Sequence, residues 1–168
     1  TRNAGAGLWV EPVEHEGNQN SSPEEVERVV EVVADLLQDG VTWTDMDGEK
    51  KQIEEGDILG VAPYNAQVAD LQEKLPDGVA VGTVDRFQGQ EAPVVIYSMA
   101  TSSPEEAPRG MEFLYSLNRL NVATSRARCC CVLVSNSRLF EPACRSVRHM
   151  RLANGLCEVG AEESGAKP

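Results

Sequence analysis

A polar segment at residues 83–91, with the sequence TVDRFQGQE, carries side chains that could bind a phosphorylated ligand. The Thr83 hydroxyl and the unshielded backbone N–H of Gly89 are suited to phosphate oxygens, and Asp85 can orient its neighbours. The Glu91 carboxylate could accept hydrogen bonds from a ribose hydroxyl. Because the segment follows a predicted strand, we expect it to lie at the carboxyl edge of a sheet, where ligands of α/β folds bind.

A second candidate is the sequence NRLNVATSRAR at residues 118–128, which is predicted to be helical and ends before an apolar strand. Arg119 and Arg126 are seven residues apart and therefore share a helix face. An arginine at the end of a helix can clamp a transferring phosphoryl group through its planar guanidinium group. Spacing alone favours the simpler alternative, a helix whose exposed arginines are only solvated.

Charge is distributed unevenly along the 168 residues, which carry a net charge of −12. That total argues against a general coating of nucleic acid. Residues 113–151, however, contain seven arginines and a single acidic residue, Glu141. Such a basic block suggests that the chain binds an anion at a specific site. Pairing of these arginines with the acidic half of the chain is an equally weighted alternative.

The candidate residues depend on an alternation of apolar strands and amphipathic helices. Ser22 is the predicted N-cap of a helix that ends at Gly40, with Glu25 closing a capping box. Asn65 is predicted to cap a second helix, and Asp45–Gly48 to form a hairpin turn. The strands are predicted at residues 8–15, 57–62, 79–84, 93–99 and 129–134, and the helices at 22–40, 65–75, 113–127 and 142–153. This order favours a mostly parallel sheet covered by helices.

The five cysteines, at positions 129, 130, 131, 144 and 157, lack the Cys-x-x-Cys spacing of a metal site. We interpret them as small buried apolar residues in the reducing cytoplasm. No apolar run approaches the roughly 20 residues that a membrane-spanning helix needs, so no membrane contact is expected. Because the chain begins with Thr1 instead of Met, we expect it to be part of a longer protein.

Three segments resemble the conserved motifs of superfamily 1B helicases. Residues 63–67 (PYNAQ) resemble motif IV, residues 82–91 (GTVDRFQGQE) motif V, and residues 121–128 (NVATSRAR) motif VI. The motifs occur in the family's order, and the resemblance extends from about Leu8 to Ala153. It is closest to the group that includes the helicase of nonsense-mediated decay, the helicase–nuclease of Okazaki-fragment processing and bacterial RecB-like helicase–nucleases.

The resemblance implies the second of two RecA-like domains, an α/β fold of three layers with helices on both faces of a mostly parallel sheet. Residues 1–159 would form this domain, with a small hairpin around residues 41–53, and residues 160–168 a disordered tail. In the family, ATP lies between the two RecA-like domains of one polypeptide. The implied partners are therefore the first RecA-like domain and single-stranded DNA, with RNA as the other possibility.

The family's functional residues are carried over by position. Arg126 corresponds to the arginine finger that contacts the γ-phosphate, Glu91 to the residue that holds the ribose, and Gly89 lies beside the phosphates. The implied nucleic-acid contacts are Pro63, Tyr64, Asn65, Gln67, Thr83 and Asp85.

The chain lacks other parts of such a motor. The P-loop sequence G-x-x-x-x-G-K-[ST] is absent, and no Asp-Glu pair ends an apolar strand to bind Mg²⁺. We therefore expect ATP and Mg²⁺ to act in the full-length protein, with no metal ligand in this chain. The isolated chain is expected to have no ATPase activity. The alternatives are a stand-alone module that binds single-stranded nucleic acid without hydrolysis, and a purely structural interaction domain.

Overall fold

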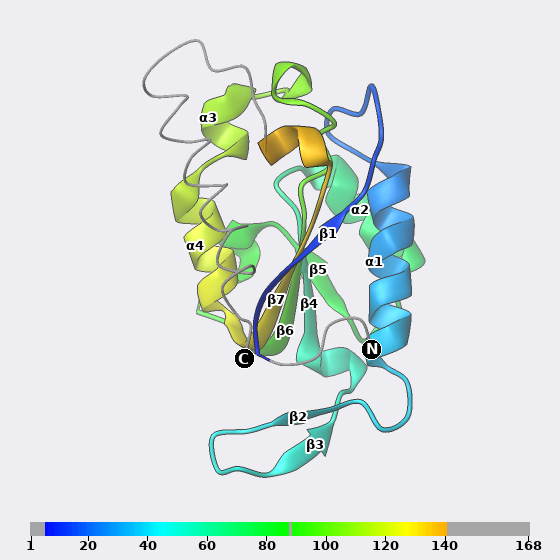
Figure 1. Ribbon diagram of the computed structural model, residues 1–168, viewed down its shortest axis with the longest axis vertical. Helices are drawn as coiled ribbons and strands as arrows, with labels where there is room; N and C mark the ends of the chain where they lie inside the picture. Colours follow the sequence, from blue (N-terminus) through cyan, green and yellow to red (C-terminus); the bar gives the residue numbers. More distant parts are fainter. Residues whose placement is uncertain (1–5, 88, 141–168) are drawn as a thin grey trace.

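The computed structural model describes residues 6–87 and 89–140, so the helix predicted at residues 142–153 and the tail at 160–168 lie outside the described residues. Within them, a five-stranded parallel sheet has the order β1-β7-β6-β4-β5 (Figure 1). The strands are β1 Gly7–Pro12, β4 Ile58–Val61, β5 Ala80–Gly82, β6 Ala92–Ser98 and β7 Ala127–Ser135. The parallel sheet predicted from the sequence is confirmed.

Helices cover both faces of this sheet and complete three layers (Figure 1). One face is covered by α1 (Pro23–Leu36) and α2 (Asn65–Lys74), and the other by α3 (Gly110–Leu114) and α4 (Leu117–Ser125). Short 3₁₀ turns lie in the connections: η1 Glu55–Asp57, η2 Val84–Phe87, η3 Pro104–Glu106 and η4 Ser137–Phe140. The predicted fold class, a three-layer α/β domain of the RecA-like kind, is thereby confirmed.

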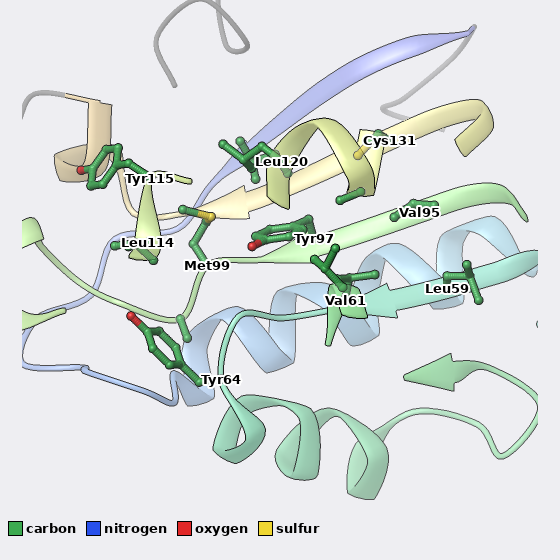
Figure 2. Close-up of a cluster of buried hydrophobic side chains, with 14 of the residues drawn as sticks. Leu59, Val61, Tyr64, Val95, Tyr97, Met99, Leu114, Tyr115, Leu120 and Cys131 are labelled. Atoms are coloured by element: carbon green, nitrogen blue, oxygen red, sulfur yellow. The ribbon is translucent and has the colours of Figure 1, made fainter. Parts of the chain in front are cut away.

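The central strands β4 and β6 are buried along their whole length, because helices cover both faces of the sheet. Successive side chains of a strand point to opposite faces. Val95 and Tyr97 therefore join the core beneath α3 and α4, whereas Val94 and Ile96 join the core beneath α1 and α2. Figure 2 shows the first of these cores, to which α4 contributes Leu120.

The start of α1 matches the predicted cap only in part. The Ser22 hydroxyl accepts a hydrogen bond from the Glu25 N–H at 3.2 Å, as a capping box requires. The reciprocal bond does not form, because the Glu25 side chain turns into the protein and the Ser22 N–H donates to Gln67 Oε1 at 2.8 Å. The helix ends at Leu36, before the predicted end at Gly40.

Two further helix boundaries differ from the prediction. The single helix predicted at residues 113–127 is broken at Tyr115, whose hydroxyl donates to the Leu139 carbonyl at 2.6 Å and anchors the turn between α3 and α4. Asn65 is the first residue of α2 and not its cap. The cap position belongs to Tyr64, and no side chain accepts a hydrogen bond there.

The predicted hairpin is formed by β2 (Thr42–Thr44) and β3 (Lys50–Gln52). It projects beyond the amino edge of the main sheet, the edge at which the parallel strands begin (Figure 1). Asp45 shapes its turn by accepting hydrogen bonds from the N–H groups of Asp47 and Glu49, at 2.9 and 3.0 Å. Gly48 adopts a φ of 83°, which the turn requires and which favours glycine.

Candidate functional site

The motif V segment runs from one edge of the sheet to the other. Gly82, which ends β5, lies level with Tyr97 near the end of β6, whereas Ala92 begins β6 at the opposite edge. Thr83 therefore lies at the carboxyl edge, where the strands end, and Glu91 lies at the amino edge. The expectation that the whole segment occupies the carboxyl edge is wrong, because the connection between two parallel strands must cross the sheet.

Buried and closely packed residues hold this crossover in place. Val84 and Phe87 of η2 belong to the core beneath α3 and α4. At Gly82 a Cβ atom would lie 2.6 Å from Arg86 Cδ, so the close approach of the two residues requires glycine or movement of the arginine. Gly89 has a φ of 83°, which lets the chain turn into β6. The exposed Gly89 backbone is thereby presented two residues before Glu91.

At the amino edge, Arg126 lies between α4 and β7 and next to the first residue of β6. It is the C-cap residue of α4, and its carbonyl accepts a hydrogen bond from the Ala92 N–H at 3.0 Å. Its Nε atom is buried without a hydrogen-bond partner, and no carboxylate of residues 6–87 and 89–140 forms an ion pair with it. A desolvated donor without a partner is unfavourable, so this guanidinium group is suited to bind an anion.

Glu91, at the same edge, is paired with Arg128. The Arg128 Nε atom lies 3.3 Å from Glu91 Oε2, and both side chains are about half exposed, at 50% and 51%. Such an exposed pair contributes on the order of 0–1 kcal/mol. It connects the end of motif V to the start of β7 and engages one of the two Glu91 oxygens. The structure thus places Gly89, Glu91 and Arg126 at one edge of the sheet, and their contacts with ATP stay a prediction.

At the carboxyl edge, burial separates the predicted nucleic-acid contacts into two groups. The side chains of Asn65 and Asp85 are exposed, and that of Thr83 is half-buried. The buried group consists of Pro63, Tyr64 and Gln67. These three side chains offer little surface to a nucleic-acid strand in this structure, and direct contact through them stays a prediction. They pack beneath the chain that carries the exposed residues.

Gln67, fully buried in the first turn of α2, connects three elements. Its Nε2 donates to Ser98 Oγ at 2.8 Å, and its Oε1 accepts from the Ser22 N–H at 2.8 Å. Ser98 is the last residue of β6, and Ser22 caps α1. The glutamine of motif IV therefore fixes α2 against the sheet and against α1.

Glu25 is the centre of the same buried network. Its Oε2 accepts hydrogen bonds from Ser98 Oγ at 2.5 Å and from the Ala100 N–H at 2.8 Å, and its Oε1 lies 2.9 Å from His15 Nε2. Ala100 has a φ of 67°, a left-handed conformation that residues other than glycine rarely adopt. The carboxylate therefore holds the loop after β6 in an otherwise unfavourable conformation.

His15 completes the network from the end of β1. Its Nδ1 lies 2.7 Å from Ser102 Oγ, and its carbonyl accepts from Asn136 Nδ2 at 2.6 Å. The His15 and Glu25 side chains are both 0% exposed, so their polar atoms depend on these internal partners. Sequence reasoning missed the network because Ser22 and Glu25 fit a capping box, and a histidine at the end of a predicted strand was the only other signal.

Of the three cysteines of β7, only Cys131 is buried as the sequence predicts, and Cys129 and Cys130 are partly buried. Burial raises the pKa of the Cys130 thiol to about 11 and that of Cys131 to about 12, which keeps both protonated at neutral pH. Cys144 and Cys157 lie outside the described residues.

Two other kinds of site were sought in the part of the chain that the structure describes. It contains no group of three or more His, Cys, Asp or Glu side chains that could hold a metal ion. None of its helices is both long and apolar enough to cross a membrane.

Residues 10–138 match the model of a family described as AAA domain. The match covers more than half of the chain, which therefore belongs to this family. The chain is also similar to "DNA polymerase alpha-associated DNA helicase A" of Saccharomyces cerevisiae, with 34% identity over 115 residues, 66% of this chain and 16% of that protein. Identity to "DNA-binding protein SMUBP-2" of Rattus norvegicus is 33% over 128 residues, 74% of this chain and 11% of that protein.

A third relative is "DNA replication ATP-dependent helicase/nuclease JHS1" of Arabidopsis thaliana, 26% identical over 122 residues, 72% of this chain and 8% of that protein. The chain thus spans between 8% and 16% of the length of these three relatives. The comparisons support the resemblance to superfamily 1 helicases. The closer resemblance to RecB-like helicase–nucleases stays a prediction.

Proposed function

We propose that this chain is the second motor domain of an ATP-dependent helicase. In this proposal, its amino edge completes an ATP-hydrolysis site whose other half lies in the first RecA-like domain of the same polypeptide. The observation that carries the proposal is Arg126, a residue of that edge whose Nε atom is buried and whose guanidinium group has no partner within the described residues. The similarity to proteins named as helicases supports it.

Each residue of the amino edge has a role in this proposal. Arg126 is the arginine finger, which stabilises negative charge on the γ-phosphate in the transition state. Glu91, held on one oxygen by Arg128, offers its other oxygen to the ribose, and the Gly89 N–H faces the phosphates. ATP with Mg²⁺ supplies the phosphoryl group, and the first domain supplies the Mg²⁺ ligands.

The carboxyl edge is proposed to hold single-stranded DNA, with RNA as the alternative. The Asn65 amide and the Thr83 hydroxyl are hydrogen-bond donors of the kind that bind phosphate and sugar oxygens. Asp85 carries a negative charge, so its role is to orient neighbouring donors. The buried Tyr64 and Gln67 position this surface from beneath. Because the chain has a net charge of −12, the contact must be short and local.

Substitution of Arg126 in the full-length protein tests the proposal. Arg126→Ala should lower the kcat of nucleic-acid-stimulated ATP hydrolysis by about 10³-fold, with a smaller effect on the KM for ATP. Arg126→Lys should recover little activity, because an ammonium group lacks the planar fork of guanidinium. Arg138→Ala is the matched control, since this exposed arginine pairs with Glu16, and it should stay within about twofold of wild type. An Arg126→Ala enzyme as active as the control would show that motif VI has been assigned wrongly.

A further inference from the structure

A group of arginine and aromatic side chains lies beside the start of α2, and its arginines have no assigned role. The guanidinium carbon of Arg109 lies 4.0 Å from the centroid of the Phe113 ring, and that of Arg119 lies 4.1 Å from the same centroid. The Phe113 ring also contacts Tyr64, with 5.5 Å between the ring centroids. Arg109, Phe113 and Arg119 are called the arginine–phenylalanine cluster below.

Within the described residues, the two arginines of this cluster lack the glutamate partners that three other arginines have. Arg28, Arg128 and Arg138 each form an ion pair with a glutamate. Neither Arg109 nor Arg119 forms one with a carboxylate among residues 6–87 and 89–140. Two cations on one ring repel each other, and a shared anion would relieve that repulsion. That neither guanidinium group pairs with a described carboxylate is notable, because the chain carries 27 acidic residues.

The cluster is open to solvent and adjoins the proposed nucleic-acid surface. Arg109 is exposed, and Phe113 and Arg119 are partly exposed. Tyr64, which packs on Phe113, directly precedes the exposed Asn65. Burial raises the pKa of the Tyr64 hydroxyl, and the positive charges of Arg109 and Arg119 act in the opposite direction, so both arginines lie near this buried tyrosine.

We propose that the arginine–phenylalanine cluster binds backbone phosphates of a single nucleic-acid strand and extends the contact surface from Asn65 across α3. This inference rests on the proposed function of the carboxyl edge. A guanidinium group stacked on a ring uses its face, which leaves its in-plane N–H groups available for a phosphate. The partly exposed edge of Phe113 can add contact with a base, as aromatic residues do in proteins that bind single strands.

The test uses the 168-residue chain, labelled with ¹⁵N and titrated with oligo-dT at several salt concentrations. Arg109→Ala/Arg119→Ala should weaken binding at least tenfold. It should also make the log–log salt slope shallower by about 1.4, because about 0.7 is lost for each phosphate contact. Lys50→Ala/Lys74→Ala is the matched control, since it removes two positive charges from exposed residues of β3 and α2. The control should change the affinity less than twofold and leave the slope unchanged.

Further variants separate the failure of this inference from the failure of the proposed function. If Arg109→Ala/Arg119→Ala matches the control while Thr83→Val loses binding, the carboxyl edge binds nucleic acid and the cluster is only packing. If wild-type resonances do not shift with oligo-dT at all, both proposals fail. If inorganic phosphate at the same phosphate concentration displaces the oligonucleotide from the cluster, a free-anion site replaces the inferred one. Should the double variant misfold, as seen from its ¹H–¹⁵N spectrum, the exposed Arg109→Ala alone should weaken binding about threefold.

Discussion

A buried network at the carboxyl edge of the sheet and the Arg126 side chain at the amino edge differ in how far their polar groups are satisfied within the described residues. At the carboxyl edge, the Glu25 carboxylate meets His15 inside a fully buried network that also holds the loop after β6. At the amino edge, Arg126 keeps a buried Nε atom without a partner, and the nearby Glu91–Arg128 ion pair is half exposed. The Glu25 network at the carboxyl edge is thus satisfied within the described residues, whereas Arg126 at the amino edge has no partner among them.

This difference bears on how each edge can act. The carboxyl edge has its loops fixed by internal hydrogen bonds before any ligand arrives, which lowers the entropic cost of holding a strand. At the amino edge, an anion bound as proposed would give Arg126 the partner that it lacks among the described residues. The proposed nucleic-acid surface is therefore preorganised within this chain. The proposed nucleotide site would instead form when another domain assembles with it.

The largest expected effect on stability is at the centre of the buried network. Glu25→Ala should lower the free energy of unfolding by about 3–5 kcal/mol, because it leaves His15 and the donors of Ser98 and Ala100 buried without an acceptor. Urea denaturation followed by circular dichroism measures this loss. Glu27→Ala, at an exposed position of the same helix, is the control and should stay within about 0.5 kcal/mol of wild type.

Two outcomes would alter the interpretation of this network. A loss below about 1 kcal/mol for Glu25→Ala would mean that the network does not hold the carboxyl edge together. If the alanine variant is too unstable to purify, Glu25→Gln offers a milder test, because an amide oxygen can still accept hydrogen bonds in place of the carboxylate. It should unfold at a urea concentration between those of wild type and the alanine variant.

A much smaller loss of stability is expected when the Glu91 carboxylate at the amino edge is removed. Glu91→Ala breaks an ion pair whose members are both half exposed, so it should lower the free energy of unfolding by no more than about 1 kcal/mol. The same urea titration measures it, and 1 M NaCl should reduce the difference further, because salt screens exposed pairs. A loss as large as that of Glu25→Ala would show that the amino edge is as tightly built as the carboxyl edge, and the contrast would disappear.

The strands and the layered fold were predictable because their signal is local. The seven residues of β6 are all buried, and most of them are apolar in sequence. Ser22 was also recognised as a helix cap. The role of Glu25 was not predictable, because a cap is recognised from residue types three positions apart. Whether the glutamate side chain turns back to the helix or into the core depends on His15, Ser98 and Ala100, which are distant in sequence.

The position of the candidate site was predictable only in part. Motif V was recognised, but its two ends lie at different edges, and only the register of β5 and β6 reveals this. Burial of Gln67 depends on Ser98, which follows it by 31 residues. The break at Tyr115 likewise depends on a contact with Leu139. Sequence patterns therefore located the residues, whereas their exposure depended on tertiary contacts.

The ATPase activity of the isolated chain tests the central claim most directly, because that claim holds that the amino edge is one half of a nucleotide site. ATP turnover by purified chain, with and without oligo-dT, should not exceed that of the Arg126→Ala chain purified in the same way. An arginine finger stabilises transition-state charge but cannot by itself bind and orient the triphosphate. Turnover by the wild-type chain that Arg126→Ala abolishes would contradict the account, since this chain would then contain a complete site.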